Sequence, residues 1–414
     1  MKRRVVVTGW GILTSLSCEV DDCWNRVVNG ESGIHEIKLC DVSDIKVTIG
    51  GDLHDWSCRD LVGSKEEKKL DRFSQFAIVG AEDAMKSSGL DLESEADLTR
   101  FGSVLGSGIG GMATITEQME RLVLKGPKRV SPLTIPKLML NAGGGNIAIR
   151  YGLRGPNYSI ATACASAANA MGNSLVHIQN GSCDVMVTGG SEAAMTRMGV
   201  SAFANMRALS GRVDEPTKAS RPFDLDRDGF VFSEGAGILI FEELDRAKAR
   251  GANILAEVAG FGTSCDAGHI TSPDEQGVGA AQAMQAALDD AELNPEDIDY
   301  INAHGTSTPL GDKAETRAIK TVFNDHARKV NISSTKSQLG HSLGASGGIE
   351  LILAIKAIRN GVVPPTINLD TPDPDCDLDY TPNEATEREL TYAMSNSFGF
   401  GGHNASVIVK KFEG

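Results

Sequence analysis

Short apolar runs that resemble buried strands alternate with amphipathic, helix-like stretches along the whole chain. The expected strands are residues 5–8, 101–105, 184–188, 238–242, 256–261, 298–303 and 406–410. The expected helices are residues 71–86, 165–179, 279–292 and 349–359. This alternation predicts βαβ units whose largely parallel sheets are covered by helices on both faces. The chain is therefore expected to adopt an α/β fold.

The alternation runs through two similar cycles, and the weakest join lies near residues 250–253, where a helix is expected to end at Gly251. We predict two similar halves packed together, residues 1–252 and 253–414, rather than two independent domains. The polar stretch 210–228 and the Pro/Asp-rich stretch 364–379 are expected to be long surface loops.

The charge and the cysteines restrict the class of protein. A net charge of −15 argues against nucleic acid as a main partner, because binding phosphates requires a basic face. The eight cysteines lack CxxC or Cys/His ligand spacing, so no metal site is expected. They are predicted to be reduced thiols, mostly buried, in a cytoplasmic protein.

The N-terminus begins with a basic triplet and an apolar run, as signal peptides do. However, Thr8-Gly9 interrupts the apolar run and no small-residue cleavage site follows. No apolar stretch is long enough for a membrane span, so membrane insertion is not expected.

The segment Gly106–Gly111 matches the GxGxxG pattern of dinucleotide-binding turns. That fingerprint also needs a second strand ending in an acidic residue about 20 residues later. Residues 125–132 lie there instead and read as a loop. A glycine turn that lines a cavity is therefore the preferred interpretation.

Cys164 lies between an expected strand and a helix whose first turns are rich in small residues. A thiol at a helix N-terminus experiences the positive end of the helix dipole, which favours the thiolate. The backbone N–H groups of such a turn also stabilise an oxyanion. This setting is that of a nucleophile turn, although a buried structural cysteine is an equally good interpretation of the spacing alone.

Two histidines in glycine-flanked turns favour the interpretation of Cys164 as a nucleophile. His304 follows an expected strand, and His341 precedes an expected helix. One imidazole N–H polarises a thioester carbonyl, and a second stabilises the developing enolate. A cysteine with two such histidines has the groups that thioester carbon chemistry requires.

Cys164, His304 and His341, in these contexts, resemble the Cys-His-His set of the β-ketoacyl synthases. Residues 399–404 resemble the terminal glycine loop of that family, and the likeness covers essentially the whole chain. The resemblance implies a thiolase-like fold, in which two duplicated βαβ halves form a layered α-β-α-β-α sandwich. It also implies a homodimer.

The resemblance further implies a decarboxylative Claisen condensation in fatty acid chain elongation. Cys164 would receive an acyl chain from acyl carrier protein. Malonyl carrier protein would then lose CO2 with help from His304 and His341, and its carbanion would attack the acyl thioester. No metal or organic cofactor is implied, because the substrates arrive on the phosphopantetheine of the carrier.

Other positions take their roles from the same resemblance. Phe400 would gate the site, and its backbone N–H would complete an oxyanion hole with that of Cys164. Lys336 and Glu350 match an ion pair behind the histidines. The positions implied to contact substrate are Thr306, Thr308, Ile109, Phe203 and Phe398, although turn hydroxyls and core packing are the alternative interpretations.

Asp312 and Glu315 have the spacing of a capping box, and we expect Asp312 to be the N-cap of a helix. Basic residues form two clusters, Lys65, Lys68, Lys69 with Arg72 and Lys125 with Lys128 and Arg129, which could also be ordinary solvated faces. Since carrier proteins are acidic, the resemblance implies that a local basic surface steers them to the enzyme. Its residues would be Lys65, Lys68, Lys69, Lys128, Arg129 and Arg207.

Several alternative families differ from this sequence at specific residues. A thiolase would need a second cysteine near the C-terminus, but none follows Cys376. Initiating and chalcone-type synthases carry Asn at the position of His341. Chain-length factors lack the active cysteine, and a glycine-motif oxidoreductase lacks the rest of its fingerprint. A type II polyketide ketosynthase shares all three residues and is the main alternative.

Overall fold

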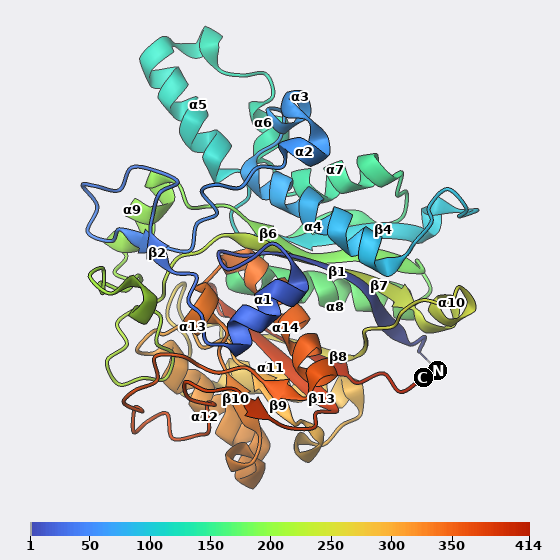
Figure 1. Cartoon of the computed structure of the whole chain (residues 1–414), viewed down its shortest axis with the longest axis vertical. Helices are drawn as coiled ribbons and strands as arrows, with labels where there is room; N and C mark the ends of the chain where they lie inside the picture. Colours follow the sequence, from blue (N-terminus) through green and yellow to red (C-terminus); the bar gives the residue numbers. More distant parts are fainter. Residues whose placement is uncertain (1) are drawn as a thin grey trace.

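A ten-stranded mixed sheet forms the framework of the computed structural model, which describes residues 2–414 (Figure 1). Its order is β10-β9-β13-β14-β8-β1-β7-β6-β4-β5. The strands are β1 (Val5–Leu13), β4 (Phe101–Gly106), β5 (Asn157–Ile160), β6 (Val185–Glu192), β7 (Gly235–Glu243), β8 (Ala256–Cys265), β9 (Tyr300–Asn302), β10 (Asn331–Ser333), β13 (Tyr392–Gly399) and β14 (His403–Lys410). Two small ribbons pair β2 (His35–Glu36) with β3 (Ile49–Gly50), and β11 (Val362–Val363) with β12 (Thr386–Glu387).

The helices separate most of these strands along the chain. They are α1 (Val20–Val28), α2 (Arg59–Val62), α3 (Ser64–Glu67), α4 (Arg72–Ser88), α5 (Met112–Lys125), α6 (Thr134–Leu138), α7 (Ala142–Tyr151), α8 (Ser166–Gln179), α9 (Arg197–Asn205), α10 (Leu244–Ala249), α11 (Val278–Ala291), α12 (Gly311–Phe323), α13 (Lys336–Leu339) and α14 (Ser346–Asn360). Short 3₁₀ turns, Ala163–Ala165 and Leu343–Ala345, lead into α8 and α14.

Two groups of five strands repeat one pairing pattern. In β5-β4-β6-β7-β1, the first two pairings are parallel and the last two are antiparallel. The group β10-β9-β13-β14-β8 has the same sequence of pairings. The groups join where Val5–Val7 of β1 pair with residues 256–258 of β8. This repetition confirms the predicted duplication of the fold.

The prediction of largely parallel sheets is wrong, because two of the four pairings in each group are antiparallel. A parallel pairing needs a crossover, whereas a direct return leaves neighbouring strands antiparallel. A tight turn at residues 400–402 connects β13 directly to β14, and the return from β6 to β7 has no helical crossover over the sheet.

The helices complete a five-layer arrangement. The central helices α8 and α14 contact each other and both groups of strands. On the outer faces, α4 packs against β1 and β7, while α11 packs against β8 and β14. Figure 1 shows α8 and α14 in the middle, between the upper and lower strands. The predicted α-β-α-β-α layering is therefore confirmed.

The two stretches expected to be surface loops are instead partly buried. In residues 210–228, Phe223 and Asp224 are fully buried, and in residues 364–379 Cys376 is 1% exposed. Their charges are neutralised internally: Arg221 Nε lies 2.8 Å from Asp224 Oδ1, and Arg227 Nη1 lies 2.8 Å from Asp373 Oδ2. Burial of a charge is tolerated where a partner and hydrogen bonds compensate for its lost hydration. Polar composition therefore gave a wrong prediction here.

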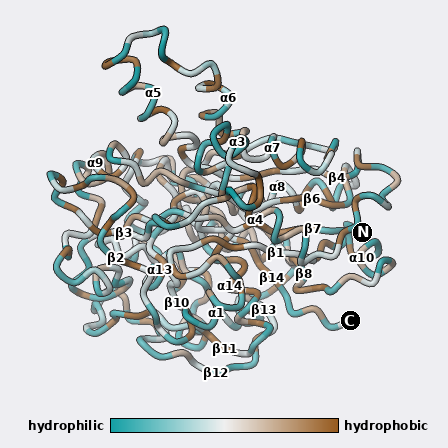
Figure 2. The backbone as a smooth tube through the Cα atoms, turned by 45° about the horizontal axis from the view of Figure 1, so that its top comes forward, coloured by the Kyte–Doolittle hydropathy of each residue, from teal (hydrophilic) through white to brown (hydrophobic). Residues whose placement is uncertain are grey.

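The helices α5 and α6 project from the rest of the molecule (Figures 1 and 2). Both chain ends lie on the same side in these views. Within residues 2–414, no helix combines the length and apolar character needed to cross a membrane.

Replacing Gly237 of β7 with alanine tests the central packing. An added Cβ would lie 2.1 Å from the backbone nitrogen of Ile349 and 2.2 Å from the carbonyl carbon of Gly348 in α14. Backbone cannot move aside as a side chain does, so Gly237→Ala should destabilise the protein by about 3 kcal/mol. Thermal unfolding measures the effect.

The matched control is Gly145→Ala in the interior of α7, where an added Cβ meets nothing within 4 Å. It should raise stability by about 0.5–1 kcal/mol, because alanine restricts the unfolded chain and favours helix. A Gly237→Ala protein that unfolds at the wild-type temperature would contradict the described contact of β7 with α14.

Candidate active site

A cavity of about 600 Å³ opens between the two groups of strands. Cys164, His304 and His341, which lie far apart in the sequence, all line it. Gly108 and Ile109 also line this cavity, so the glycine-rich turn after β4 lines a cavity, as predicted.

The turn before α8 positions Cys164. Ala163 has a φ of 48°, a left-handed conformation that costs a non-glycine residue of order 1–3 kcal/mol. The hydroxyl of Ser166 stabilises the turn by donating to the Ala163 carbonyl at 2.6 Å, and it accepts the Thr162 N–H at 2.9 Å. Cys164 is thereby placed at the start of α8 and is 8% exposed.

The two histidines come from the other half of the chain and lie near the Cys164 sulfur. His341 Nε2 lies 3.0 Å from Cys164 Sγ, and His341 Nδ1 lies 3.0 Å from Ser346 Oγ. The rings of His304 and His341 are 5.4 Å apart and nearly perpendicular. His304 Nδ1 is buried without a hydrogen-bond partner. The structure therefore brings the three predicted residues together.

Burial controls the protonation of all three groups. It raises the pKa of the Cys164 thiol to about 12, although the Lys336 ammonium and the Phe400 backbone N–H oppose this shift. Burial also lowers the pKa of His304 and of His341 well below the usual value, and the nearby Lys336 charge acts in the same direction. The histidines are therefore neutral near pH 7. The predicted preference for a thiolate is therefore outweighed by the burial of Cys164.

A buried ion pair lies behind the histidines, as expected. The Lys336 ammonium contacts the Glu350 carboxylate, and both side chains are at most 3% exposed. Neither residue lines the cavity. Burial raises the pKa of Glu350, while Lys336 opposes the shift. The pair acts on the site through its electric field rather than by contact with the cavity.

The remaining predicted substrate contacts lie around the cavity. Thr306 and Thr308 line one part of it, with their hydroxyl oxygens 3.1 Å apart. Phe203, Phe398 and Phe400 also line it, and the Phe203 ring packs edge-on against Phe230 and Phe232. Hydroxyls and an apolar wall thus face the same space as Cys164.

The prediction of a capping box at Asp312 and Glu315 is wrong. The helix α12 begins at Gly311, so Asp312 lies inside its first turn and Leu310 is the N-cap. The buried Asp312 carboxylate accepts the N–H groups of Phe223 at 2.8 Å and Ser307 at 3.2 Å. The distant chain segment around Phe223, invisible in local spacing, determines this role.

Glu315 instead supports a catalytic candidate. Its carboxylate accepts the backbone N–H groups of His304 and Gly305, both at 2.8 Å. Burial raises the pKa of Glu315 to about 7, against the effect of these hydrogen bonds. These hydrogen bonds hold the turn that carries His304. Glu315 also lines the cavity.

With this geometry established, comparison with known proteins identifies the family. Residues 2–247 match the family described as beta-ketoacyl synthase, N-terminal domain, and residues 255–370 match the beta-ketoacyl synthase, C-terminal domain. The chain belongs to the β-ketoacyl synthase family. The predicted resemblance is thus confirmed.

Similar proteins cover the chain from end to end. A 3-oxoacyl-[acyl-carrier-protein] synthase 2 from Staphylococcus aureus (strain COL) is 48% identical over 412 residues, which cover 99% of both chains. The protein of the same name from Synechocystis sp. is 47% identical over 412 residues, covering 100% of this chain and 99% of the relative.

A solved structure is similar over its full length. It is that of a type II polyketide synthase acyl-carrier protein in complex with its ketosynthase bound to the hexaketide, and one of its chains has a TM-score of 0.92, with 34% identity and 100% coverage of both chains. This similarity confirms the thiolase-like ketosynthase fold.

Sequence analysis missed Glu192, which organises this ketosynthase site. Its fully buried carboxylate at the end of β6 accepts Ser107 Oγ at 3.0 Å and the N–H groups of Gly108 at 2.7 Å and Gly344 at 3.2 Å. It therefore joins the glycine-rich turn to the turn before α14. An acidic residue shortly after the apolar run of residues 185–187 was the available signal, because a buried charge needs several donors.

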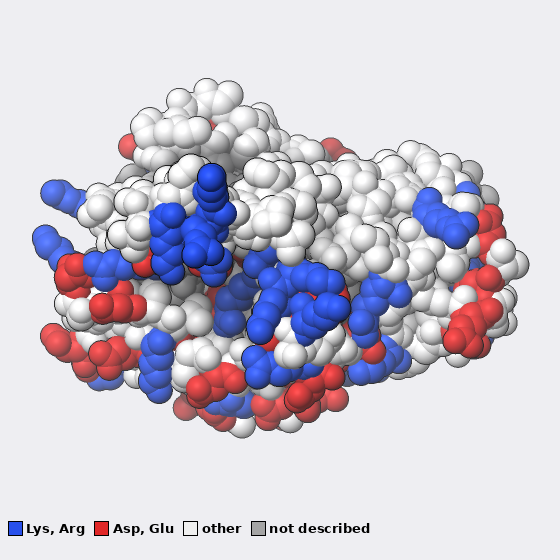
Figure 3. All heavy atoms as spheres, turned by 90° about the horizontal axis from the view of Figure 1, so that it is seen from above, with Lys and Arg blue, Asp and Glu red and all other residues white. Residues whose placement is uncertain are grey.

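The basic residues lie outside the cavity, with one exception. Lys65, Lys68, Lys69, Lys125, Lys128 and Arg129 are exposed around α3 and the end of α5. Figure 3 shows lysine and arginine side chains gathered near the middle of the face seen from above. Arg207 is exposed and lines the cavity. Arg72 is not part of a solvated cluster, because it pairs with the buried Glu234 at 2.7 Å.

The pH dependence of alkylation tests whether burial or the helix dipole controls Cys164. With a pKa of about 12, the thiolate fraction should increase about tenfold for each pH unit below that value. Alkylation by iodoacetamide should therefore accelerate steadily from pH 6.5 to 8.5. Mass spectrometry of the Cys164 peptide measures the rate, with the exposed Cys265 as an internal reference. A rate that levels off below pH 8 would show that the dipole dominates.

Proposed function

We propose that this chain condenses malonyl-[acyl carrier protein] with an acyl chain held on Cys164, giving 3-oxoacyl-[acyl carrier protein] and CO2 in fatty acid chain elongation. The observation that carries the proposal is the contact of 3.0 Å between Cys164 Sγ and His341 Nε2, with His304 beside it, at the wall of a cavity. The curated relatives at 47% and 48% identity are named for the 3-oxoacyl product.

In the first stage, the Cys164 sulfur attacks the thioester carbonyl of an acyl carrier protein. A bond forms between the acyl carbon and Sγ, and the bond to the pantetheine sulfur breaks. The thiol proton passes to the departing pantetheine sulfur. Backbone N–H groups of Cys164 and Phe400 stabilise the oxyanion, in agreement with the Phe400 N–H that already interacts with the Cys164 sulfur.

In the second stage, malonyl carrier protein loses CO2, and the electrons of the broken C–C bond form an enolate. Neutral His304 and His341 donate N–H hydrogen bonds to the enolate oxygen. His341 can do so from Nε2, because the Ser346 hydroxyl can donate to Nδ1 and leave the proton on Nε2. The carbanion attacks the acyl carbon, and the bond from that carbon to the Cys164 sulfur breaks. The sulfur leaves as a thiolate and recovers a proton from solvent water. Decarboxylation supplies the nucleophile, so the proposed reaction uses no metal or organic cofactor.

The surrounding residues assist the reaction without forming or breaking covalent bonds. Burial keeps both histidines neutral, and the charge of Lys336, which is paired with Glu350, acts in the same direction. The hydroxyls of Thr306 and Thr308 hold the pantetheine arm, and the Phe400 ring gates the site. The acyl chain lies against Ile109, Phe203 and Phe398, three of the apolar residues that line the cavity.

Type II polyketide synthesis is the second candidate, since one similar solved structure holds a ketosynthase of that kind. Both activities use the same thiol and histidines. The products separate them: fatty acid elongation adds one two-carbon unit and releases the chain, whereas polyketide synthesis repeats the extension. The higher identity to the 3-oxoacyl-[acyl-carrier-protein] synthase 2 relatives favours fatty acid elongation.

We further propose that the functional halves are residues 1–252, which carry the nucleophile, and residues 253–414, which carry both histidines. The repeated strand pattern supports a boundary near Gly251, just before β8. Eight free cysteines are consistent with the reducing cytoplasm, the compartment we propose for the enzyme.

A second copy of the chain is the proposed partner at the β5 edge. At the opposite end of the sheet, β10 is fully buried, whereas β5 has only β4 beside it and is partly exposed. Open edges recruit another strand, and large exposed apolar patches mark interfaces. Apolar side chains on the neighbouring α5 and α7 include Val123 at 75% and Ile149 at 82% exposure. The expected assembly is a homodimer.

Acyl carrier protein is the other proposed partner. Its acidic surface would meet Lys65, Lys68, Lys69, Lys128 and Arg129, while Arg207 would lie at the cavity itself. In the solved structure described above, a ketosynthase binds an acyl-carrier protein. Local basic charge is needed because the whole chain has a net charge of −15.

Intact-protein mass spectrometry after incubation with long-chain acyl carrier protein tests the proposed function. The wild type should gain the mass of one acyl group, and Cys164→Ala should gain none. His304→Asn should still become acylated, but its condensation rate should fall about 10²- to 10³-fold, as expected when one oxyanion donor is lost.

Cys265→Ala, which removes an exposed thiol, is the control and should be acylated like the wild type. An adduct of the same mass on Cys164→Ala would disprove the assignment of the nucleophile. Repeated extension with malonyl carrier protein would favour the polyketide candidate.

Charge reversal tests the carrier surface. Lys68→Glu with Lys69→Glu should raise the KM for acyl carrier protein at low salt and leave kcat unchanged, because the substitutions weaken encounter only. The difference should diminish at high salt, where charges are screened. The double variant Lys248→Glu, Lys329→Glu changes the net charge equally elsewhere and is the control. Equal KM values for the two double variants would contradict the docking proposal.

A further inference from the structure

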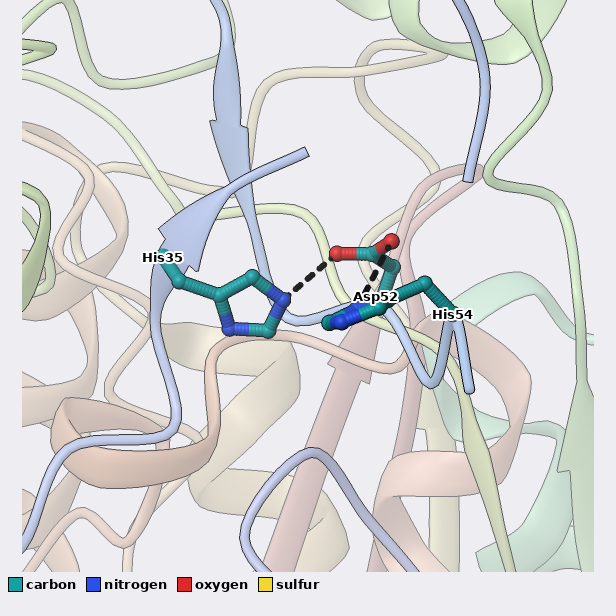
Figure 4. Close-up of side chains that lie close together, drawn as sticks. All are labelled: His35, Asp52 and His54. Atoms are coloured by element: carbon teal, nitrogen blue, oxygen red, sulfur yellow. Dashed lines mark hydrogen bonds and ion pairs between the residues drawn. The ribbon is translucent and has the colours of Figure 1, made fainter. Parts of the chain in front are cut away.

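Three side chains with metal-ligand chemistry meet outside the proposed active site (Figure 4). His35 begins β2, while Asp52 and His54 follow β3. Pairing of His35 with Gly50 in the β2–β3 ribbon brings these positions together. One potential ligand atom from each residue lies within 4.8 Å of the other two. Figure 4 shows both imidazole rings beside the Asp52 carboxylate.

His35 is held by acceptors at both ring nitrogens. Its Nδ1 lies 3.0 Å from the Gly33 carbonyl oxygen, to which it must donate. Its Nε2 lies 2.7 Å from Asp52 Oδ1. A histidine that donates one N–H to a backbone carbonyl and turns its other nitrogen toward a carboxylate has the orientation of a metal ligand.

The Asp52 carboxylate is fixed from the protein side. Its side chain is fully buried. Its Oδ2 accepts the backbone N–H groups of Leu39 at 2.8 Å and Lys38 at 3.2 Å. These bonds hold the carboxylate in the orientation that faces the two histidines.

His54 supplies the decisive observation. Its Nε2 lies 3.1 Å from the carboxylate oxygen Oδ2 of Asp55. Its Nδ1 is buried, has no hydrogen-bond partner within residues 2–414, and lies 3.6 Å from Asp52 Oδ2. A cation between Nδ1 and this carboxylate would give the buried nitrogen the partner that the described residues do not supply.

We propose that His35 Nε2, the Asp52 carboxylate and His54 Nδ1 bind a divalent first-row transition metal ion, with Zn²⁺ as the expected occupant. Two imidazoles and a carboxylate suit Zn²⁺, and water completes the coordination because the two histidine side chains are 30% and 23% exposed. Binding releases the proton from His35 Nε2. Small side-chain rotations bring the three ligand atoms to bonding distance.

The ion has a structural role in this proposal. It fastens the two ends of the segment from His35 to Asp52, whose Ile37, Val42 and Ile49 pack in the same apolar cluster as Cys164 and Leu343. The metal therefore stabilises one wall of the proposed active site and takes no part in the condensation. The spacing of sixteen residues between His35 and Asp52 explains why motif spacing predicted no metal site.

Co²⁺ is the probe, because its visible spectrum reports the ligand type. After dialysis against EDTA, the wild type should bind one equivalent of Co²⁺ with weak d–d bands and no thiolate charge-transfer band. Since losing even a supporting residue lowers metal affinity about 10- to 100-fold, His54→Ala and His35→Ala should lower it at least about 100-fold. Zn²⁺ should raise the unfolding temperature of the wild type and not that of His54→Ala.

His269→Ala removes an exposed histidine elsewhere and should bind one equivalent like the wild type. His54→Ala is the primary variant, since within residues 2–414 the close polar contacts of the His54 ring are to Asp55 and Asp52 alone. The proposal is overturned if wild type retains no Co²⁺ through gel filtration, if His54→Ala binds as tightly as wild type, or if a thiolate band shows that cysteine holds the ion. Failure of this site would leave the proposed condensation intact, because acylation of Cys164 is measured separately.

Discussion

Close approach between backbones is the constraint on which the proposed active site depends. The starts of the two central helices approach the strands with no side chain between them at two glycines. An added Cβ on Gly106 would be 2.3 Å from the carbonyl carbon of Ser166, and one on Gly190 would be 2.6 Å from the Gly344 carbonyl oxygen. Larger residues would move α8 and α14 away from the strands and from each other. The distance of 3.0 Å between Cys164 and His341, which come from opposite halves, requires that both helices stay in place.

Burial that follows from this packing determines the electrostatics. Cys164, His304 and His341 are removed from water, so their neutral forms are favoured. The charges of Lys336 and Glu350 nearby are compensated mainly by each other. A charge that develops during reaction in such a dry site interacts strongly with fixed dipoles. The packing that excludes water thus also strengthens the interaction of a few backbone N–H groups with a charge that develops during the reaction.

Local signals predicted what local interactions determine. The helix expected at residues 71–86 is Arg72–Ser88, since the Asp71 carboxylate caps its start and Gly89 adopts a left-handed conformation at its end. The reactive residues were found from chemistry, because a cysteine in a small-residue turn and two histidines beside glycines are rare. These features need no knowledge of distant contacts.

Long-range contacts account for what the sequence did not reveal. Buried Arg227 looked like a surface charge, because its partner Asp373 lies 146 residues away. Asp224 pairs with the nearby Arg221, but it also accepts the N–H of Thr371, which lies 147 residues away. Asp312 looked like a cap, although its donors include the backbone of Phe223. Glu192 and the metal-ligand cluster likewise join segments that only the fold brings together.

The turns before α8 and α14 give the duplication a chemical meaning. Ala163 and Leu343 have the same left-handed φ, 48° and 47°, and Ser166 and Ser346 begin the two helices. The repeat is visible in the sequence as Cys-Ala-Ser-Ala-Ala at residues 164–168 and Gly-Ala-Ser-Gly-Gly at residues 344–348.

These equivalent turns lie in contact, so two positive helix ends converge on one site. The Glu192 carboxylate accepts the Gly344 N–H and occupies the end of α14. Cys164 occupies the matching position at the end of α8. Because one helix end is already satisfied by a fixed carboxylate, the other is left to stabilise the anion that forms when the Cys164 thioester is attacked. The same backbone turn therefore occurs twice: one copy binds the Glu192 carboxylate, and the other carries the reactive Cys164.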